Sequence, residues 1–337
     1  MAVTMHDVAS LAGVSIKTVS NVVNDYQYLK PETRQRVLDA IDKLGYRPNL
    51  SARGLRSGRT GVISLIIPDI RNAYFAELAD EVIRAADAQK LSVIIEQSNG
   101  DKERELGLLS GPRTSMLDGI LYSVLGLEEA DAHLLEKIET PLVLLGDRIF
   151  HGPTDHVAMR NADSTKAATA YLLAQGRRRV VAFGAHPGEV IGSAGLRLSG
   201  YREALDEAGV EFDPALVVEV GDWFRKNGAD AMHTLVESGV PFDGVVAFND
   251  LIGLGAMRVM QEAGIRIPQD VAVVGFDDID ETRYSLPSLS TIDPGKGEIA
   301  RVAVAFLLDR IARGSQAIPP REHLADFHIV ERESSAV

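Results

Sequence analysis

Polar side chains suited to ligand binding follow several apolar, strand-like runs of this chain. Residues 98–99 (Ser-Asn), 147–148 (Asp-Arg), 249–250 (Asn-Asp) and 277–278 (Asp-Asp) each come at the end of such a run, and Trp223 follows another. In open parallel sheets, ligands bind beyond the carboxyl ends of the strands. Loops at strand ends are polar in most proteins, so a single pair would indicate nothing. Four pairs and an indole together favour a shared cleft for a polar ligand.

Motifs of catalytic sites are missing from the sequence. There is no GxGxxG after the first strand-like run, and no GxxxxGK[ST], GxSxG or HExxH. The eight histidines, among them the expected loop residues His151 and His186, are scattered, and there are no cysteines, so no metal or other cofactor is expected. Asp277 and Asp278 are adjacent at a strand end, where neighbouring side chains point apart. We therefore expect one of them to contact a ligand and the other to be structural.

Charge is distributed unevenly along the chain. The 337 residues carry a net charge of −13, yet residues 1–60 hold nine Lys/Arg and five Asp/Glu, a net of +4, which leaves −17 for the rest. A basic head on an acidic body predicts that only the head meets a polyanion. Neither a signal-like start nor a run of eighteen apolar residues occurs, so secretion and a membrane span are not expected. The lack of cysteine is compatible with a reducing cytoplasm.

Two kinds of segment alternate after Gly61. Apolar runs such as VISLII, PLVLLG, GVVAFN and VAVVGF alternate with amphipathic stretches such as AYFAELADEVIRAADAQ and LIGLGAMRVMQEAG. This alternation predicts an α/β body with parallel sheets that are covered on both faces. Eight or more such strand–helix units are too many for a single open sheet. We therefore expect two doubly wound subdomains with a break near residue 160.

The first sixty residues predict short helices. Thr4 and Asp7 match a capping box, Ser15 is a second N-cap candidate, and Gly13 allows a tight turn between the two helices. Six apolar side chains are spaced to bury one side of each helix, namely Val8, Leu11, Ala12, Val14, Val19 and Val22. This layout predicts a helix-turn-helix motif, in which the second helix faces base edges.

Several side chains lie off the buried side of the second helix. Ile16 can contact a thymine methyl group, Lys17 can donate to guanine, and Ser20 and Asn21 are polar. A third helix, PETRQRVLDAIDKLG, opens with Pro31 at a first-turn position. A small helical unit without a role in DNA binding is the alternative interpretation of these helices alone.

The segment NLSARGLRSGRTG, residues 49–61, places three arginines and no acid around Leu55. Such a Gly/Ser/Arg run is usually a solvated linker. It is also part of a wider resemblance. HDVASLAGVSIKTVSNVVN, ETRQRVLDAIDKLGYRPN, ARGLRSGRTGVISLIIPDIRNAYFAEL and VVGFDD occur in this order. Together, from Thr4 to about Val330, they resemble the lactose/galactose repressor (LacI/GalR) family of bacterial transcription regulators.

The resemblance implies a domain organisation. A helix-turn-helix head would span residues 1–48 and a hinge helix residues 49–60. The body would have the periplasmic-binding-protein fold. Its N-terminal subdomain would comprise residues 61–160 and about 293–320, and its C-terminal subdomain residues 161–292 and about 321–332.

The resemblance also implies partners and contacts. A homodimer in the bacterial cytoplasm would bind a pseudo-palindromic operator, with Leu55 of each hinge wedged between central base pairs in the minor groove. The resemblance further implies a small effector, a sugar or sugar derivative, which would bind between the body subdomains and control operator affinity. The implied DNA contacts are Thr4, Ser15, Ile16, Lys17, Thr18, Ser20, Asn21, Asn24, Arg53, Leu55 and Arg56. The implied effector contacts are Tyr74, Phe75, Ser98, Asp147, Arg148, Ser193, Arg197, Trp223, Asn249 and Asp277.

Four positions depart from the usual family pattern. Gly54 precedes the hinge leucine and costs a helix ~1 kcal/mol relative to alanine, so we expect a hinge that folds only on DNA. Asn21 stands where many relatives carry a base-reading arginine, and asparagine prefers adenine. Lys30 stands where a serine cap is usual, and Pro294 removes a backbone donor after the penultimate strand.

Two other functions are compatible with an α/β body of this kind. A solute-binding protein of a transporter would need a secretion signal and would have no basic head. A sugar-handling enzyme would need catalytic motifs that this sequence lacks. The sequence therefore favours an effector-controlled transcription regulator, most simply a repressor. Since no heptad array follows Val330, a dimer is favoured over a tetramer.

Overall fold

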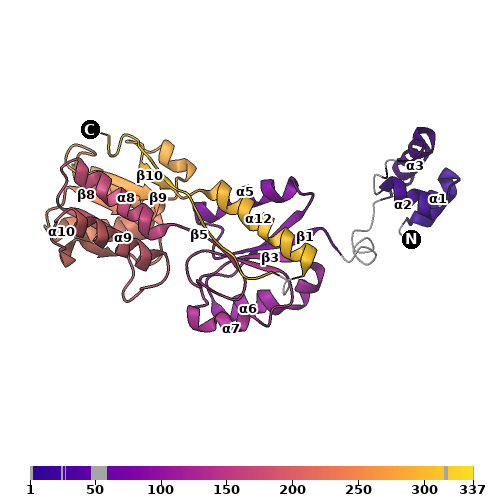
Figure 1. Cartoon of the computed structure of the whole chain (residues 1–337). Helices are drawn as coiled ribbons and strands as arrows, with labels where there is room; N and C mark the ends of the chain where they lie inside the picture. The colour runs from indigo at the N-terminus through magenta and orange to yellow at the C-terminus, as the bar shows by residue number, and fades with distance from the viewer. Residues whose placement is uncertain (1–2, 24–25, 27, 47–58, 315–317, 337) are drawn as a thin grey trace. The chain divides into compact units, whose positions relative to one another are not determined.

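The structure, a computed structural model, describes residues 3–23, 26, 28–46, 59–314 and 318–336. The chain divides into two compact units, a head of residues 1–61 and a body of residues 62–337, and each is described by itself (Figure 1). The predicted DNA contacts Asn24, Arg53, Leu55 and Arg56 lie outside the described residues, as does most of the predicted hinge.

The head consists of three helices around a small apolar core. They are α1 (Met5–Ala12), α2 (Ile16–Val23) and α3 (Pro31–Leu44). Val8, Val19 and Val37, one from each helix, are fully buried where the helices meet. The three-helix arrangement predicted from the capping and apolar spacing is therefore present.

The predicted caps at the starts of α1 and α2 are formed. The backbone N–H of Thr4 donates to Asp7 Oδ2 at 2.8 Å, and the Thr4 side chain accepts from the Asp7 N–H, which completes the capping box. Ser15 Oγ accepts from the Thr18 N–H at 3.1 Å. Gly13 between the helices has φ 63°, a left-handed conformation that glycine adopts without a Cβ clash. These bonds satisfy backbone donors that a helix start leaves unpaired.

One expected core residue of the head is exposed. Leu11 has 46% of its surface accessible, whereas Val8, Ala9 and Ala12 on the same helix are buried. At ~100° per residue, the buried face of α1 is centred near Ala12, and Leu11 lies about 110° around the helix from that centre. The expectation that Leu11 is buried is therefore wrong, because an eight-residue helix leaves the phase of its apolar face weakly determined.

We expect Thr4→Val to loosen α1. The substitution keeps the shape of the side chain but removes the hydroxyl of the capping box, which costs a helix about 1 kcal/mol. Hydrogen exchange of the full chain should show the amides of residues 5–12 exchanging roughly fivefold faster. Ser10→Val, on an exposed position of the same helix, is the control; equal acceleration in both variants would contradict a role for the cap.

The body contains two six-stranded sheets. The first has the order β11-β5-β4-β3-β1-β2 and is parallel throughout. The second has the order β12-β10-β9-β8-β6-β7, and only β12 is antiparallel to its neighbour. The strands of the first are β1 (Val62–Ile67), β2 (Ser92–Gln97), β3 (Gly119–Ser123), β4 (Leu142–Leu145), β5 (Asp155–Met159) and β11 (Glu322–Ala325). Those of the second are β6 (Val180–Ala185), β7 (Val217–Glu219), β8 (Gly244–Ala247), β9 (Ala272–Phe276), β10 (Ser290–Asp293) and β12 (His328–Val330).

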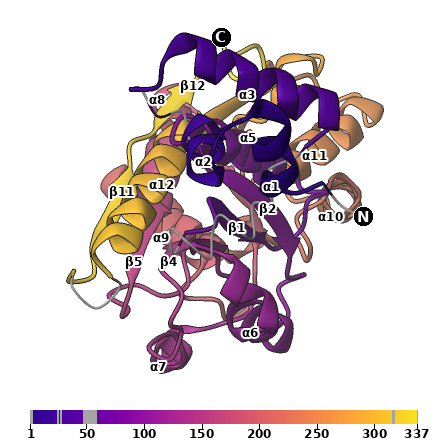
Figure 2. The same ribbon diagram turned by 90° about the vertical axis from the view of Figure 1, so that its right-hand side faces the viewer.

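Helices cover both faces of each sheet. On the first sheet, α5 (Ala73–Asp87) and α12 (Lys296–Arg313) lie side by side on one face, and α6 (Lys102–Ser110) and α7 (Ala132–Leu135) lie on the other (Figures 1 and 2). On the second sheet, α8 (Asn161–Ala174) packs with α9 (Ser193–Glu207), and α10 (Arg225–Glu237) packs with α11 (Asp250–Glu262). The predicted doubly wound α/β architecture is confirmed. Within the described ranges, no helix has the length and apolar character that crossing a membrane requires.

The chain passes between the two sheets three times. The first crossing joins β5 to α8, at the break expected near residue 160, and the second joins β10 to α12. The third lies between β11 and β12, at residues 326–327. Residues 321–332 were expected to belong wholly to the C-terminal subdomain. That assignment is corrected for β11, because Glu322–Ala325 pairs in parallel with β5 and completes the edge of the first sheet.

Candidate functional site

Helix α2 presents two of the predicted DNA contacts at its first turn. Ile16 is 41% exposed and Lys17 is exposed beside it. The hydroxyls of Ser15 and Thr18 lie 2.9 Å apart and form the cap of the helix, while the predicted contacts Ser20 and Asn21 are half-buried. An exposed isoleucine and an exposed lysine at the start of the second helix are what a helix-turn-helix offers to base edges.

The body holds a cavity of about 390 Å³ between its two sheets. Its walls come from the segment after β1, the ends of β4 and β5, the start of α9, and the ends of β7, β8 and β9. Nine of the ten predicted effector contacts line it, namely Tyr74, Phe75, Asp147, Arg148, Ser193, Arg197, Trp223, Asn249 and Asp277. The strand-end residues Asp147, Asn249 and Asp277 thus lie at one cavity, together with aromatic side chains.

The tenth predicted contact, Ser98, does not line the cavity. It is fully buried, and its hydroxyl donates to Glu105 Oε1 at 3.2 Å. The Glu105 carboxylate also accepts the backbone N–H groups of Gly126 and Leu127, each at 3.0 Å. Ser98 thus belongs to a buried hydrogen-bond cluster that fixes the loop after β2. The next residue, Asn99, lines the cavity in its place.

Arg197 lies at the centre of the cavity wall and is 2% exposed. Its Nε donates to Asn161 Oδ1 at 2.7 Å and its Nη1 donates to the carbonyl of Phe248. Its Nη2 lies 3.9 Å from Asp277 Oδ1, and its guanidinium stacks 3.5 Å from the centre of the Phe276 ring. Burial lowers the pKa of Arg197, although neighbouring carboxylates oppose that shift. The guanidinium therefore joins α9 to the ends of β8 and β9 and to the start of α8.

Two carboxylates face Arg197 from opposite subdomains. Asp277, after β9, is 4% exposed and has φ 114°. Burial raises its pKa to about 7, although the charges of Arg197 and Lys296 oppose the shift. Asp147, after β4, accepts a hydrogen bond from Ser193 Oγ at 2.7 Å through Oδ2. Its Oδ1 is buried and has no hydrogen-bond partner among the described residues, so an acceptor for a ligand donor is available there.

Trp223 supplies an aromatic wall whose polar atom is already satisfied. The indole Nε1 donates to the carbonyl of Gly184 at 3.1 Å, and the ring lies 5.3 Å from that of His186. Asn249 Nδ2 donates to the carbonyl of Trp223 at 3.3 Å, while its Oδ1 caps α11 by accepting from the Ile252 N–H at 2.9 Å. Asn249 therefore holds the Trp223 loop in place, and the ring face is left for apolar contact with a ligand.

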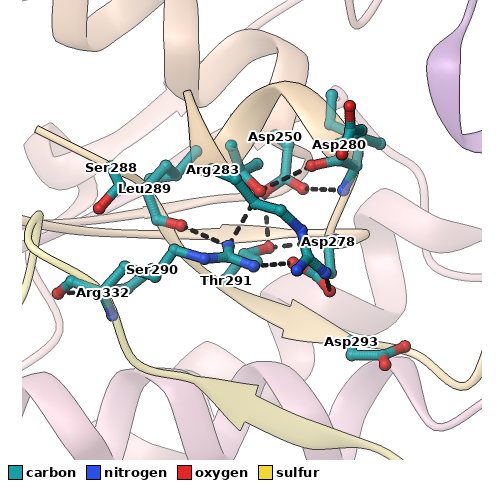
Figure 3. Close-up of polar contacts among 12 residues, drawn as sticks. Asp250, Asp278, Asp280, Arg283, Ser288, Leu289, Ser290, Thr291, Asp293 and Arg332 are labelled. Atoms are coloured by element: carbon teal, nitrogen blue, oxygen red, sulfur yellow. Dashed lines mark hydrogen bonds and ion pairs between the residues drawn. The ribbon is translucent and has the colours of Figure 1, made fainter. Parts of the chain in front are cut away.

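Asp278 does not line the cavity but belongs to a polar cluster on the second sheet (Figure 3). Its carboxylate accepts hydrogen bonds from Arg332 and, at 3.4 Å, from Arg283. Arg332 also donates to the carbonyl of Leu289 at 2.8 Å. The side chains of Asp277 and Asp278 diverge as expected, and the second ties the C-terminal segment to the loop before β10.

Asp250 is buried in the same cluster (Figure 3). Its carboxylate accepts the Thr291 hydroxyl at 2.6 Å and the Ile279 N–H at 3.0 Å. Burial and the neighbouring Asp277 raise the pKa of Asp250 well above its usual value. Asp250, which follows β8, therefore forms buried hydrogen bonds and does not line the ligand cavity.

Several lining residues were not predicted as contacts. Asp69 and Arg71 follow β1, His186 and Glu189 follow β6, and Asp222 precedes Trp223. His186 was expected only to be a loop residue. The residues after β1 and β6 would have been found had the strand-end rule been applied to these two strands, because both strands end at the same edge as their neighbours.

Contacts across the cavity join the two subdomains directly. Ser193 to Asp147 is one, and the ion pair of Arg148 with Glu189 at 3.3 Å is another. Farther out, the backbone N–H of Asp280, which follows β9, donates to Glu77 Oε1 on α5 at 2.8 Å. These links depend on the relative position of the subdomains, so a ligand that rearranges them changes that position. Among the described residues, no group of three or more His, Asp or Glu side chains could hold a metal ion.

The fold and both sites define a class of protein: a helix-turn-helix unit linked to a two-subdomain body with a ligand cavity. Residues 4–49 match the family "Bacterial regulatory proteins, lacI family", and residues 169–335 match a periplasmic binding protein-like domain. The chain belongs to the lacI family of bacterial regulatory proteins. It is a DNA-binding transcription regulator.

Solved structures of relatives cover 82% or more of this chain. A LacI-family transcriptional regulator from Sanguibacter keddieii is 48% identical with a TM-score of 0.76, covering 82% of this chain and 98% of that one. The complex of the regulator CelR with cellobiose is 30% identical with a TM-score of 0.71, covering 99% and 100%. The Lac repressor dimer bound to operator and the anti-inducer ONPF is 25% identical with a TM-score of 0.85, covering 100% of both chains.

Proposed function

We propose that the protein is a homodimeric repressor in the bacterial cytoplasm whose affinity for a pseudo-palindromic operator is set by a sugar-like effector in the body cavity. The observation that carries this proposal is the cavity itself, which combines the face of Trp223 with the carboxylates of Asp147 and Asp277. Sugars need both features, because their CH faces stack on aromatic rings while their hydroxyls donate to carboxylates. We assign the protein no catalytic reaction and no cofactor.

The relatives support this proposal by analogy. In the solved structures, CelR is in complex with cellobiose and the Lac repressor dimer is bound to operator and an anti-inducer. In this chain, the effector would contact the nine predicted residues that line the cavity. The operator would contact the exposed first turn of α2, from Ser15 to Thr18, together with Thr4, Ser20, Asn21, Asn24 and the hinge residues Arg53, Leu55 and Arg56.

The two sites would be coupled through the links across the cavity. An effector that donates to Asp147 Oδ2 competes with Ser193, and one that reaches Arg148 competes with Glu189. Either change alters the contacts that hold the subdomains at their present angle. The effect of the effector on operator affinity and that of the operator on effector affinity must then be equal in magnitude.

Selection from a random duplex library, followed by gel shifts at moderate salt, tests the proposal. We expect enrichment of an inverted repeat with a flexible pyrimidine-purine centre. A panel of sugars is then screened by thermal shift, and hits are retested for their effect on operator binding. Absence of any enriched repeat would contradict the proposed function.

Leu55→Ala tests the hinge within this proposal. Loss of the apolar wedge should weaken specific operator binding by roughly tenfold or more, since unstacked base steps would no longer be filled. Effector affinity should stay unchanged, because the cavity lies in the body. Leu38→Ala, on an exposed position of α3 in the head, is the control. If the Leu55 variant and the wild type bound the operator equally tightly, residues 49–61 would be a simple linker and the proposed role of Leu55 would be wrong.

A further inference from the structure

The loop between β6 and α9 places a carboxylate of the protein in a position that suits an anion. Glu189 Oε1 accepts the backbone N–H groups of Ala194 at 3.0 Å and Gly195 at 3.4 Å, both in the first turn of α9. Its Oε2 lies 3.0 Å from Nδ1 of His186 and 3.3 Å from Nη2 of Arg148. N–H groups at a helix start, an imidazole and a guanidinium are donors that bind phosphate or carboxylate ligands in proteins. Here Glu189 already occupies them.

The loop is fitted closely around this carboxylate. Gly192 has φ 118°, and a Cβ added there would lie 2.5 Å from Glu189 Oε1 and 3.0 Å from Arg148 Cζ. A Cβ added at Gly195 would lie 2.5 Å from the carbonyl oxygen of Val190. Both glycines let the loop fold directly onto the start of α9. The space left at these two glycines therefore allows the Glu189 carboxylate to lie against the start of α9.

The other guanidiniums of the cavity also have partners from the chain. Arg71 lies 2.6 Å from Asp69 Oδ2. Arg197 uses its Nε and Nη1 on Asn161 and on the Phe248 carbonyl. The cavity lining as a whole contains five carboxylates and three guanidiniums. A phosphate group entering it would have to displace a carboxylate and would face the remaining ones.

An acceptor, by contrast, is left open. Asp147 is 5% exposed, and its Oδ1 has no hydrogen-bond partner in the described part of the chain. A buried acceptor without a partner is costly, and a ligand hydroxyl would supply the missing donor. Among the described residues that line this cavity, each guanidinium thus has a partner, whereas Asp147 Oδ1 is a free acceptor.

We propose that Glu189 determines ligand specificity by filling the anion position of the cleft, so that the cleft takes an uncharged, polyhydroxylated ligand and excludes its phosphorylated form. The proposal rests on the proposed function, which makes this cleft the effector site. The uncharged ligand donates a hydroxyl to Asp147 and leaves Glu189 on its four donors. Glu189 lines the cavity but forms no hydrogen bond to this ligand, and it is a specificity-determining residue.

Inorganic phosphate is the probe for the first test. The melting temperature of the full-length protein is measured with phosphate and with chloride at equal ionic strength, in the wild type and in Glu189→Ala. The variant vacates the four donors, so we expect it to bind phosphate roughly tenfold or more tightly than the wild type, on the scale of one charge-assisted hydrogen bond. Glu203→Ala removes one charge from an exposed position of α9 and should behave as the wild type.

A second variant separates charge from space. Glu189→Gln keeps the size of the side chain and the packing of the loop, and it should gain less affinity for phosphate than Glu189→Ala. If neither variant binds phosphate more tightly than Glu203→Ala, or if the wild type binds it equally tightly, the assignment is overturned.

Matched pairs of free sugars and their 6-phosphates provide the second test. Wild-type hits are expected among the free sugars, and Glu189→Ala should shift preference toward the phosphorylated partner. A wild type stabilised by the phosphorylated members alone would overturn the proposal. These measurements need no DNA. Failure to select an operator would therefore overturn the proposed function, whereas failure in the phosphate tests would overturn the role of Glu189 alone.

Discussion

Replacing Arg197 by leucine is expected to destabilise the body by about 3–5 kcal/mol, which is the usual cost of removing one partner of a buried charged network. The guanidinium is 2% exposed, so solvent cannot replace it. Its loss leaves Asn161 Oδ1 and the carbonyl of Phe248 without their donors. It also leaves Asp277 without its nearest guanidinium, at 3.9 Å. Leucine is smaller and apolar and restores none of these bonds.

Urea unfolding followed by tryptophan fluorescence measures this effect in the full chain. Trp223 is the single tryptophan of the sequence, and its ring lies 5.3 Å from the Arg197 guanidinium, so the signal reports the body. The control is Arg202→Leu, the same change on an exposed position of α9. Equal unfolding midpoints for the two variants would show that the buried network contributes nothing specific.

The cavity illustrates what the sequence predicts well. Asp147, Asn249 and Asp277 were found because they end apolar runs, and parallel strands bring such ends to one edge of a sheet. That rule needs only the positions of the strands along the chain. Ser193 and Arg197 lie on a helix and follow no strand, so only the family resemblance placed them in the cleft.

The same rule does not give the direction of a side chain. Ser98 and Asn99 end one run, and only Asn99 lines the cavity. The difference arises because the Ser98 hydroxyl donates a hydrogen bond to buried Glu105, seven residues later on α6, and so points away from the cavity. A partner of this kind is fixed by packing between elements. The local sequence pattern contains no information about it.

Short elements are the other source of error. Leu11 was expected in the core of the head, yet a helix of eight residues completes only about two turns, and several phases then fit its apolar residues. Strand β11 has four residues and was expected on the second sheet, but the edge of the first sheet beside β5 accommodates it. In both cases, packing against neighbouring elements determines which face is buried or which sheet the strand joins, because the intrinsic preference of so few residues is weak.

The hydrogen bonds around Asn249 refine its expected role. A strand-end asparagine in the cleft suggested a ligand contact, but both of its polar atoms are engaged, one in the cap of α11 and one on the carbonyl of Trp223. Part of its effect on a ligand would then be exerted through the position of the indole. Asp147, with an unpaired oxygen in the same cavity, is the more direct contact.

Replacing Asp277 by asparagine is expected to make the stability of the body less dependent on pH. Burial raises the pKa of this carboxyl to about 7 in the folded protein, against 3.8 for an exposed group. Between these values the folded state binds more protons than the unfolded state. Stability from this group is therefore present at low pH and falls as the pH rises toward 7. The shift corresponds to about 4 kcal/mol at most, at 1.36 kcal/mol per pKa unit.

Asparagine keeps the shape of the side chain and stays neutral throughout this range. The variant should therefore be more stable than the wild type by up to about 4 kcal/mol near pH 8 and by about 2 kcal/mol near pH 5.5, because the unfolded carboxyl, with a pKa of 3.8, is ionised at both pH values. Urea unfolding of the full chain at both pH values measures the difference, and Asp206→Asn, on an exposed position of α9, is the control. The groups that face Asp277 are Arg197, Lys296, Glu77, Asp147 and Asp250, and they are the same in both proteins. Their own titration largely cancels in the comparison. If the unfolding free energies of the wild type and the Asp277 variant changed with pH in parallel, Asp277 would already be ionised in the folded protein below neutral pH. The charges of Arg197 and Lys296 would then stabilise its carboxylate.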